Sequence, residues 1–208
     1  MDTLCEIMNH LHFGDQVNIL PHPGEVLFYP GFFDKQESDT YLKYLLDDIP
    51  WIQEPVTLFG RSVMQPRLTA FFGDRGMKYA YSGLSMQAEE WTPPLLRIKE
   101  KVEAKCNAAF NVCLLNLYRD GKDYMGWHRD NERSLGPLPV IASLSFGEVR
   151  LFQFRHYVEK IPVISLELEH GSMVLMKGET QKYWEHRLTK TTLPAGPRIN
   201  LTFRFVHL

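Results

Sequence analysis

The chain has 208 residues and a formal charge of −2 at pH 7, with 44% hydrophobic and 23% charged residues. This composition excludes a disordered or fibrous chain and provides enough apolar material for one globular domain covering residues 1–208. No apolar run approaches the roughly 20 residues of a membrane span, so a membrane protein is also excluded.

The cysteines and the N-terminus indicate an intracellular protein. The three cysteines lack the spacing of a disulfide framework or of a cysteine zinc site. No basic segment followed by an apolar stretch marks a signal peptide. We therefore expect a cytoplasmic location in a bacterium and a nuclear one in a eukaryote.

Acidic and basic side chains are unevenly distributed. Residues 1–60 contain two basic and ten acidic residues, which leaves a formal charge of −8 there and +6 over residues 61–208. A mildly basic region permits contact with phosphates but does not establish it, because such a bias is more often a solvated surface.

The N-terminal half is predicted to hold an arm and two helices. Residues 1–25 show no periodicity and are expected to form the arm. Asp34 and Glu37 have the spacing of a capping box, and apolar residues recur after them at helical intervals up to Pro50. A second helix is predicted after Thr92, with an apolar stripe that runs to Ala109.

Residues 111–208 consist of short apolar segments separated by glycine and proline, as in a β-protein. Strands are predicted at Val112–Tyr118, Val140–Phe146, Val149–Phe154, Val163–Leu168, Ser172–Met176 and Arg198–Val206. They follow one another without intervening helices, so the sheet should be mainly antiparallel and close into a barrel or jelly roll. The predicted fold class is α+β, mainly β, with the helices packed outside.

Asn116 and Tyr118 lie on one face of the first of these strands, because strand side chains alternate between faces. Buried amide and phenol groups require hydrogen-bond partners. They therefore either bond to neighbouring backbone or line a ligand cavity.

The sequence His128-Arg-Asp130 places an imidazole and a carboxylate where both can bind one metal ion. With 8 histidines and 25 acidic residues, about one such pair is expected by chance, so a third ligand is needed. His186 and His170 are the candidates. His186 lies 12 residues before Arg198, so one strand and a turn would bring it beside the last strand, whereas His170 sits at a predicted turn and is expected to be structural.

The last strand divides into an apolar and a polar face. The polar face carries Arg198, Asn200, Thr202 and Arg204, and the apolar face carries Ile199, Leu201, Phe203 and Phe205. The Cα atoms of the two arginines should be roughly 20 Å apart, which leaves a gap suited to a small dicarboxylate. Solvated arginines on an exposed sheet face are the alternative.

Taken in order, these motifs resemble the AlkB family of Fe(II)/2-oxoglutarate-dependent nucleic-acid dealkylating dioxygenases, closest to its duplex-DNA repair members. The resemblance rests on Asn116-Leu-Tyr118, His128-Arg-Asp130, His186 and Arg198-Ile-Asn-Leu-Thr-Phe-Arg204, and extends from about Pro66 to the C-terminus. It implies a double-stranded β-helix, or jelly roll, over 111–208. Residues 26–110 would form helical support and a nucleotide-recognition lid.

The resemblance implies a cofactor set and residue roles. His128, Asp130 and His186 would bind Fe(II), with 2-oxoglutarate and molecular oxygen as cosubstrates. Six residues are implied to bind 2-oxoglutarate. Tyr118 and Arg198 would hold its distal carboxylate, and Asn116 and Arg204 would lie nearer the metal. Asn200 and Thr202 would complete the polar wall of this site. Arg204 would also hold Asp130.

The implied reaction is hydroxylation of an N-methyl group on 1-methyladenine or 3-methylcytosine in DNA, with release of formaldehyde and succinate. The partner would be alkylated single- or double-stranded DNA, or RNA, and a monomer is expected. The alternatives are an RNA or protein demethylase of the same superfamily, and a non-catalytic jelly-roll module that binds damaged nucleic acid or uses zinc to stabilise its fold.

Substrate contacts are predicted in an aromatic and basic region and beside the metal motif. By resemblance, they are Phe59, Gly60, Arg61, Arg67, Tyr79, Ala80, Tyr81, Ser82, Asn131 and Glu132. Phe59 would lie at the tip of a hairpin and enter the duplex as a wedge, and Arg67 would contact phosphate or the opposite base. Asn131 departs from the aspartate common in the family. Each assignment has an alternative without a substrate. Phe59 would pack on the barrel as a hairpin aromatic, Tyr79 and Tyr81 would be core residues, and Arg67 would be a solvated arginine.

The wedge assignment gives a first prediction. Phe59→Ala should impair repair of duplex DNA more than repair of the same lesion in a single strand, because only the duplex requires displacement of a paired base. Formaldehyde release from matched single- and double-stranded oligonucleotides measures the two rates. An equal decrease on both substrates would contradict the wedge.

Overall fold

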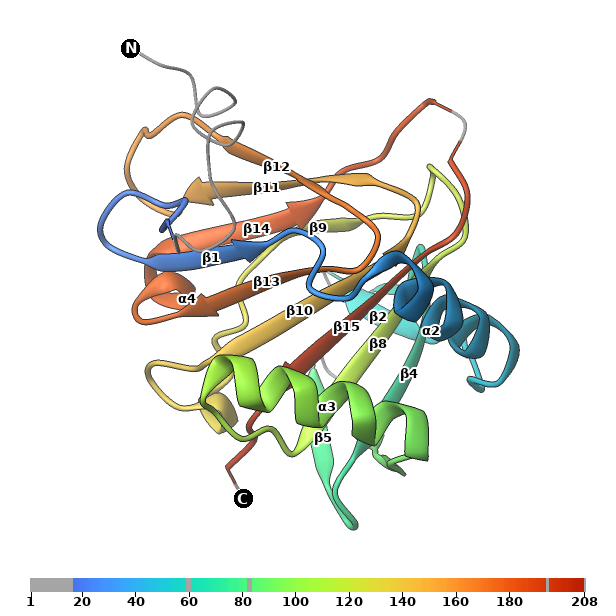
Figure 1. Ribbon diagram of the computed structural model, residues 1–208. Helices are drawn as coiled ribbons and strands as arrows, with labels where there is room; N and C mark the ends of the chain where they lie inside the picture. The colour runs from blue at the N-terminus through green and yellow to red at the C-terminus, as the bar shows by residue number, and fades with distance from the viewer. Residues whose placement is uncertain (1–16, 59–60, 82–83, 194, 208) are drawn as a thin grey trace.

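Two stacked β-sheets form the centre of the computed structural model, which describes residues 17–58, 61–81, 84–193 and 195–207 (Figure 1). The larger sheet has the order β1 (Glu25–Tyr29), β13 (Ser172–Lys177), β10 (Ile141–Gly147), β15 (Arg198–Arg204), β8 (Val112–Tyr118), β4 (Leu68–Gly73), β7 (Glu89–Glu90). The smaller sheet has the order β12 (Ile164–Leu168), β11 (Arg150–His156), β14 (Trp184–Leu188), β9 (Met125–His128). Apart from the short parallel pair β4–β7, the pairings are antiparallel, as the strand sequence predicts.

The two sides of the larger sheet are covered differently. One side packs against helices α2 (Lys35–Asp47) and α3 (Pro93–Cys106), and this core contains Leu45, Ile98 and Phe203. The other side faces the smaller sheet across a second apolar core, to which Val174 and Phe154 contribute. The mainly β jelly-roll fold is therefore confirmed, with its predicted helices outside the sheets.

Alternation along β15 separates packing from polar functions. Ile199, Leu201 and Phe203 are fully buried in the helix-covered core, as predicted. Phe205 departs from this prediction, because β15 ends at Arg204 and the Phe205 side chain is 43% exposed.

Both predicted helices are present with their predicted caps. The Asp34 carboxylate accepts from the Glu37 backbone N–H at 2.8 Å, and the Glu37 carboxylate accepts from the Asp34 N–H. Helix α3 follows Thr92 but ends at Cys106, because the next residue, Asn107, has a φ of 49° that turns the chain out of the helix. Ala109 therefore lies beyond the helix and is exposed, contrary to the predicted stripe.

Residues 26–110 supply more than helices and a lid. Strands β1 and β4 from this segment belong to the larger sheet, so the predicted boundary near 110 does not separate support from sheet. The described part of the predicted arm is also packed, since Ile19 and Leu20 are buried and Asn18 bridges to Leu27. Strands β1 and β4 are both short and largely continuous apolar runs, so they lack the alternation by which a half-buried strand is recognised in a sequence.

Two hairpins extend from the sheets. One pairs β2 (Pro55–Leu58) with β3 (Arg61–Met64), as predicted around Phe59 and Gly60, which themselves lie outside the described residues. The other pairs β5 (Lys78–Tyr81) with β6 (Leu84–Gln87). The remaining elements are a 3-10 turn at Arg133–Leu135 and the short helix α4 (Thr180–Tyr183).

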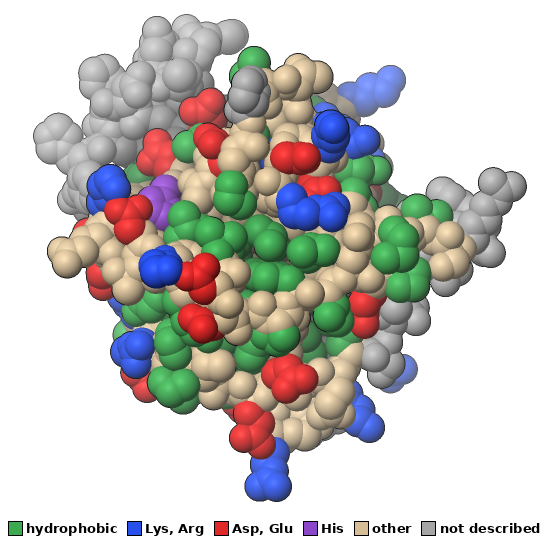
Figure 2. Space-filling view, turned by 90° about the vertical axis from the view of Figure 1, so that its right-hand side faces the viewer, with side chains coloured by type: hydrophobic (Ala, Val, Ile, Leu, Met, Phe, Trp, Pro, Cys, Tyr) green, Lys and Arg blue, Asp and Glu red, His purple; other side chains and the backbone are tan. Residues whose placement is uncertain are grey.

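The surface carries charges of both signs. On the side shown in Figure 2, acidic and basic side chains are interspersed around a central group of apolar ones. On that side, the excess positive charge of residues 61–208 therefore does not form one continuous basic patch. Within the described ranges, no helix is long and apolar enough to cross a membrane.

Candidate metal centre

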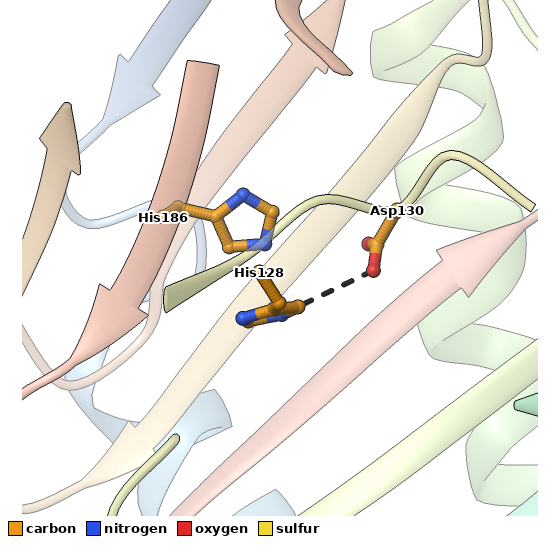
Figure 3. Close-up of side chains that lie close together, drawn as sticks. All are labelled: His128, Asp130 and His186. Atoms are coloured by element: carbon orange, nitrogen blue, oxygen red, sulfur yellow. Dashed lines mark ion pairs between the residues drawn. The ribbon is translucent and has the colours of Figure 1, made fainter. Parts of the chain in front are cut away.

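Three side chains from two elements meet between the sheets. His128 ends β9, Asp130 follows two residues later, and His186 lies in β14, where it pairs in register with His128 (Figure 3). One potential ligand atom from each lies within 4.8 Å of the others. The structure thus selects His186 over His170 as the third member of the set.

A β-bulge orients this part of β9. His186 and Leu188 are two residues apart on β14, yet they pair with His128 and Met125, which are three apart on β9. The extra residue allows both His128 and Met125 to line the cavity between the sheets. The Trp127 ring then packs against the guanidinium groups of two arginines, Arg155 at 4.5 Å and Arg187 at 4.4 Å from the ring centroid.

Each of the three side chains keeps a donor atom available. The His128 Nδ1–H donates to the Gly126 carbonyl at 2.8 Å, which leaves Nε2 unprotonated and 4.0 Å from Asp130 Oδ1. Asp130 Oδ1 is buried and has no hydrogen-bond partner among the described residues, and the same holds for His186 Nδ1. Two imidazoles and one carboxylate fit a divalent first-row transition metal.

The second carboxylate oxygen of Asp130 is held by Arg204. Arg204 donates to Asp130 Oδ2 at 2.7 and 3.2 Å, and both side chains are buried. On the other side, the Asp130 backbone N–H donates to Gln181 Oε1 at 2.9 Å. These contacts fix the carboxylate with Oδ1 turned toward the histidines, as the predicted role of Arg204 requires.

Burial and neighbouring charges set the protonation state of the group. Burial, with the neighbouring His128, lowers the pKa of His186 to about 3, and burial also lowers the pKa of His128. Burial alone would raise the pKa of Asp130, but Arg204 and the histidines outweigh it and bring that pKa to about 2. At neutral pH the site therefore presents two neutral imidazoles and a carboxylate, the forms that bind a metal.

The polar face of β15 lies beside this group. Arg198, Asn200, Thr202 and Arg204 line the same cavity of about 50 Å³ as the histidines, together with Asn116 and Tyr118 of the adjacent β8. The predicted alternative of solvated arginines is therefore wrong.

Arg198 has no carboxylate partner among the described residues. Its side chain is 2% exposed, donates to Ser145 Oγ at 2.8 Å, and lies 5.3 Å from the Tyr118 ring. Its Nε has no hydrogen-bond partner among the described residues. Burial, opposed by Tyr118 and assisted by Arg150, lowers its pKa to about 10. A buried guanidinium in this state has the charge and the free N–H group that suit an anion.

The other wall residues are held by one another. Asn200 donates to Ser143 Oγ and to the Leu144 carbonyl, and Thr202 donates to the Asn200 side-chain oxygen at 2.8 Å. Arg67 donates to Asn116 Oδ1 at 2.7 Å and is 5% exposed. Arg67 is thus part of the cavity, and the predicted solvated alternative is wrong.

The remaining predicted substrate residues are placed only in part. Phe59, Gly60 and Ser82 lie outside the described residues, as do the side chains of Arg61, Tyr79, Ala80 and Tyr81 in β3 and β5. Asn131 is exposed and Glu132 is half-buried directly after Asp130. Their roles stay predictions.

His170 is structural, as predicted. Its Nδ1 accepts from the Gly147 N–H at 2.9 Å, and its Nε2 lies 3.2 Å from Asp39. These contacts connect the β10–β11 turn to helix α2, away from the cavity.

Sequence reasoning missed two buried residues near the site, Arg150 and Gln181. Arg150 donates to three backbone carbonyls, those of Asp120, Asp123 and Thr189, and thereby ties together the loops after β8 and β14. Arg150 lies two residues before the buried Phe152 in β11, so the two side chains face the same side of the sheet. This spacing is a sequence signal that could have identified Arg150. Gln181 sits in a single helical turn, and nothing in the sequence marks it.

Known proteins are similar to this chain in sequence and in fold. The 2OG-Fe(II) oxygenase superfamily matches residues 25–204. Mouse alpha-ketoglutarate-dependent dioxygenase alkB homolog 3 is 41% identical over 194 residues, 88% of this chain and 66% of that protein, so this chain spans slightly less than two thirds of its length. Human DNA oxidative demethylase ALKBH2 is 37% identical over 190 residues, 86% of this chain and 73% of that protein.

A solved structure supports the same fold. OsALKBH1 superposes with a TM-score of 0.64 at 15% sequence identity, covering 89% of this chain and 99% of that one. At this identity the comparison concerns the fold alone.

The buried histidines predict a pH-dependent stability of the metal-free protein. Unfolded His186 takes up a proton below its ordinary pKa of 6.5, whereas the folded form does so only near 3. The free energy of unfolding should therefore fall as the pH drops below 6.5, by up to about 1.4 kcal/mol per pH unit for one group, with His128 acting in the same direction.

Urea unfolding with a chelator present, at several pH values above the ordinary Asp130 pKa of 3.8, measures this slope. His186→Leu removes one titrating group and should give a shallower dependence than the wild type. Identical slopes for the two proteins would contradict the assignment.

Proposed function

Because the chain belongs to the 2OG-Fe(II) oxygenase superfamily and, within it, to the AlkB homologues, we propose that it is an oxidative demethylase of alkylated nucleic acid. Its proposed substrates are 1-methyladenine and 3-methylcytosine in single- or double-stranded DNA. One observation carries the proposal: the buried Asp130 Oδ1 lies beside two neutral histidines, and the same cavity is lined by the Arg198 guanidinium, which has no carboxylate partner among the described residues.

Proteins of this superfamily require Fe(II), 2-oxoglutarate and molecular oxygen, and the donor set found here fits that requirement. In the proposal His128 Nε2, Asp130 Oδ1 and a ring nitrogen of His186 hold the iron. Three protein ligands leave open positions for the two cosubstrates. The bound iron supplies the oxidising chemistry: one oxygen atom of O₂ enters an N-methyl C–H bond, and the other enters 2-oxoglutarate, which leaves as succinate and carbon dioxide.

The side chains of the polar wall orient the cosubstrate. Arg198 would pair with the distal carboxylate of 2-oxoglutarate, while Ser145 and Tyr118 keep the guanidinium in place. Asn116, held by Arg67, would lie at the metal-proximal end. The buried wall excludes water from this end of the cavity.

After hydroxylation, the product is a hydroxymethyl group on a ring nitrogen. Its C–N bond breaks, the hydroxyl proton is lost as formaldehyde forms, and the nitrogen regains its unmethylated state. The nucleic-acid strand is not cut. We propose that the protein does this as an intracellular monomer, on DNA or on RNA.

Product release tests the proposal. Wild-type protein with Fe(II) and 2-oxoglutarate should release formaldehyde and succinate in equal amounts from a 1-methyladenine oligonucleotide, and His186→Ala should release neither. The same sequence made as RNA distinguishes the two nucleic acids. If both the DNA and the RNA oligonucleotide give succinate without formaldehyde, the protein is a dioxygenase but the proposed substrate is wrong. If folded, iron-loaded wild type gives neither product, the proposed enzymatic activity is wrong.

Arg198 provides a separate prediction. Arg198→Met should raise the KM for 2-oxoglutarate by about 10- to 100-fold, because a hydrogen-bonded charge pair with the distal carboxylate is lost. Succinate formation against 2-oxoglutarate concentration measures it. Arg187→Met, which removes a guanidinium packed on Trp127, is the matched control and should leave this KM unchanged. An unchanged KM in Arg198→Met would contradict the assigned anion site.

A further inference from the structure

We infer that Gln181 is a positioning residue of the metal centre, which holds the Asp130 backbone so that the carboxylate faces both histidines. The inference rests on the proposed metal role of His128, Asp130 and His186. Gln181 touches none of the atoms proposed to bind metal, and it acts through Asp130 alone.

Gln181 is placed by two hydrogen bonds in a buried environment. Its Oε1 accepts from the Asp130 N–H at 2.9 Å, and its Nε2 donates to Met176 Sδ at 3.4 Å. Gln181 is 3% exposed and Asp130 is 1% exposed. Because the amide donor and acceptor have different partners, the orientation of the side chain is determined.

Asp130 needs such a partner because it lies outside the sheet. The β9–β14 pairing includes His128 and His186 but does not extend to Asp130, which follows the last residue of β9. Its backbone N–H therefore has no strand partner and is buried. Gln181 supplies the acceptor that a strand would otherwise provide.

The same contact links the proposed ligands to each other. Helix α4 carries Gln181 and runs directly into β14, so Gln181 is five residues before His186 on one continuous segment. Asp130 is thereby fixed to the element that bears the third ligand. A second contact, from Arg129 to the Lys182 carbonyl at 2.9 Å, attaches the preceding residue to the same helix.

Helix α4 is itself anchored to the larger sheet. Thr180 Oγ1 accepts from the Glu25 N–H at 2.9 Å and lies within hydrogen-bond distance of the Glu25 and Lys177 carbonyls. Asp130 is consequently held from two directions: Arg204 of β15 binds Oδ2, and Gln181 binds the backbone. The oxygen left over is Oδ1, which points at the histidines.

Metal affinity is the test of this role. Gln181→Met keeps the length of the side chain and removes the acceptor, and Gln181→Asn keeps the amide but withdraws it by one methylene. Gln153→Met is the matched control: Gln153 is hydrogen-bonded to Arg187 of the neighbouring β14, on the sheet face opposite to the cavity-lining Phe152.

Co(II) titration of the metal-free proteins, without 2-oxoglutarate, gives the dissociation constants, and the visible spectrum of bound Co(II) reports the ligand geometry. We expect both Gln181 variants to bind Co(II) about 10- to 100-fold more weakly than the wild type, with an altered spectrum, and Gln153→Met to bind as the wild type does. If Gln181→Met does not fold, the Co(II) affinity and spectrum of Gln181→Asn test the inference instead.

Wild-type affinity and spectrum in the Gln181 variants would overturn the inference, even with a lowered Tm of the metal-free protein, since that result defines a purely structural role. An equal loss in Gln153→Met would overturn it as well. His186→Ala separates the two proposals: if it binds Co(II) as tightly as the wild type, the proposed metal site itself is wrong.

Discussion

The buried ion pair between Arg204 and Asp130 is the interaction on which the cavity depends. It joins the last strand of the larger sheet to the loop that follows β9 of the smaller one. Taking two charges out of water costs free energy that offsets much of their attraction, so this pair is weak evidence for stability. Here it engages one carboxylate oxygen and leaves the other directed at the histidines, so the pair determines how the donor set is oriented.

A single strand provides both the packing and the polar wall. The apolar face of β15 is fully buried against the helices, and its polar face lines the cavity. Neighbouring strands continue this arrangement, since Asn116 and Tyr118 of β8 pair in register with Asn200 and Arg198. The helices therefore stabilise the strand from behind while its other face remains free for polar groups. A shift of β15 by one residue in register would therefore turn its apolar side chains into the cavity and its polar side chains into the helix-covered core.

Strict alternation explains how much of this could be predicted from the sequence. The polar row of β15 was predictable because every second residue is apolar. The pair of His128 and Asp130 follows from spacing, but choosing His186 needed the distance to Arg198 and the family resemblance. Strands β9 and β14 were not predicted, because β9 has only four residues and a bulge in its pairing, and the buried face of β14 carries the polar His186 between Trp184 and Leu188. Gln181 was unpredictable because its partner is a backbone N–H distant in sequence.

The charges of the cavity also explain why metal and cosubstrate suit the site together. Arg204 is neutralised by Asp130, while Arg198 has no carboxylate among the described residues and is close enough to Arg150 for the two charges to repel. Arg150 has Asp120 and Asp123 near it, whereas Arg198 and Arg67, which both line the cavity, donate to the neutral side chains of Ser145 and Asn116, so positive charge remains in the cavity. In the proposed complex a divalent cation alone would add to this positive charge, and a dianion alone would lack the metal at its other end. Bound together they cancel, with the negative ends of 2-oxoglutarate placed at Arg198 and at the metal, so each should favour binding of the other.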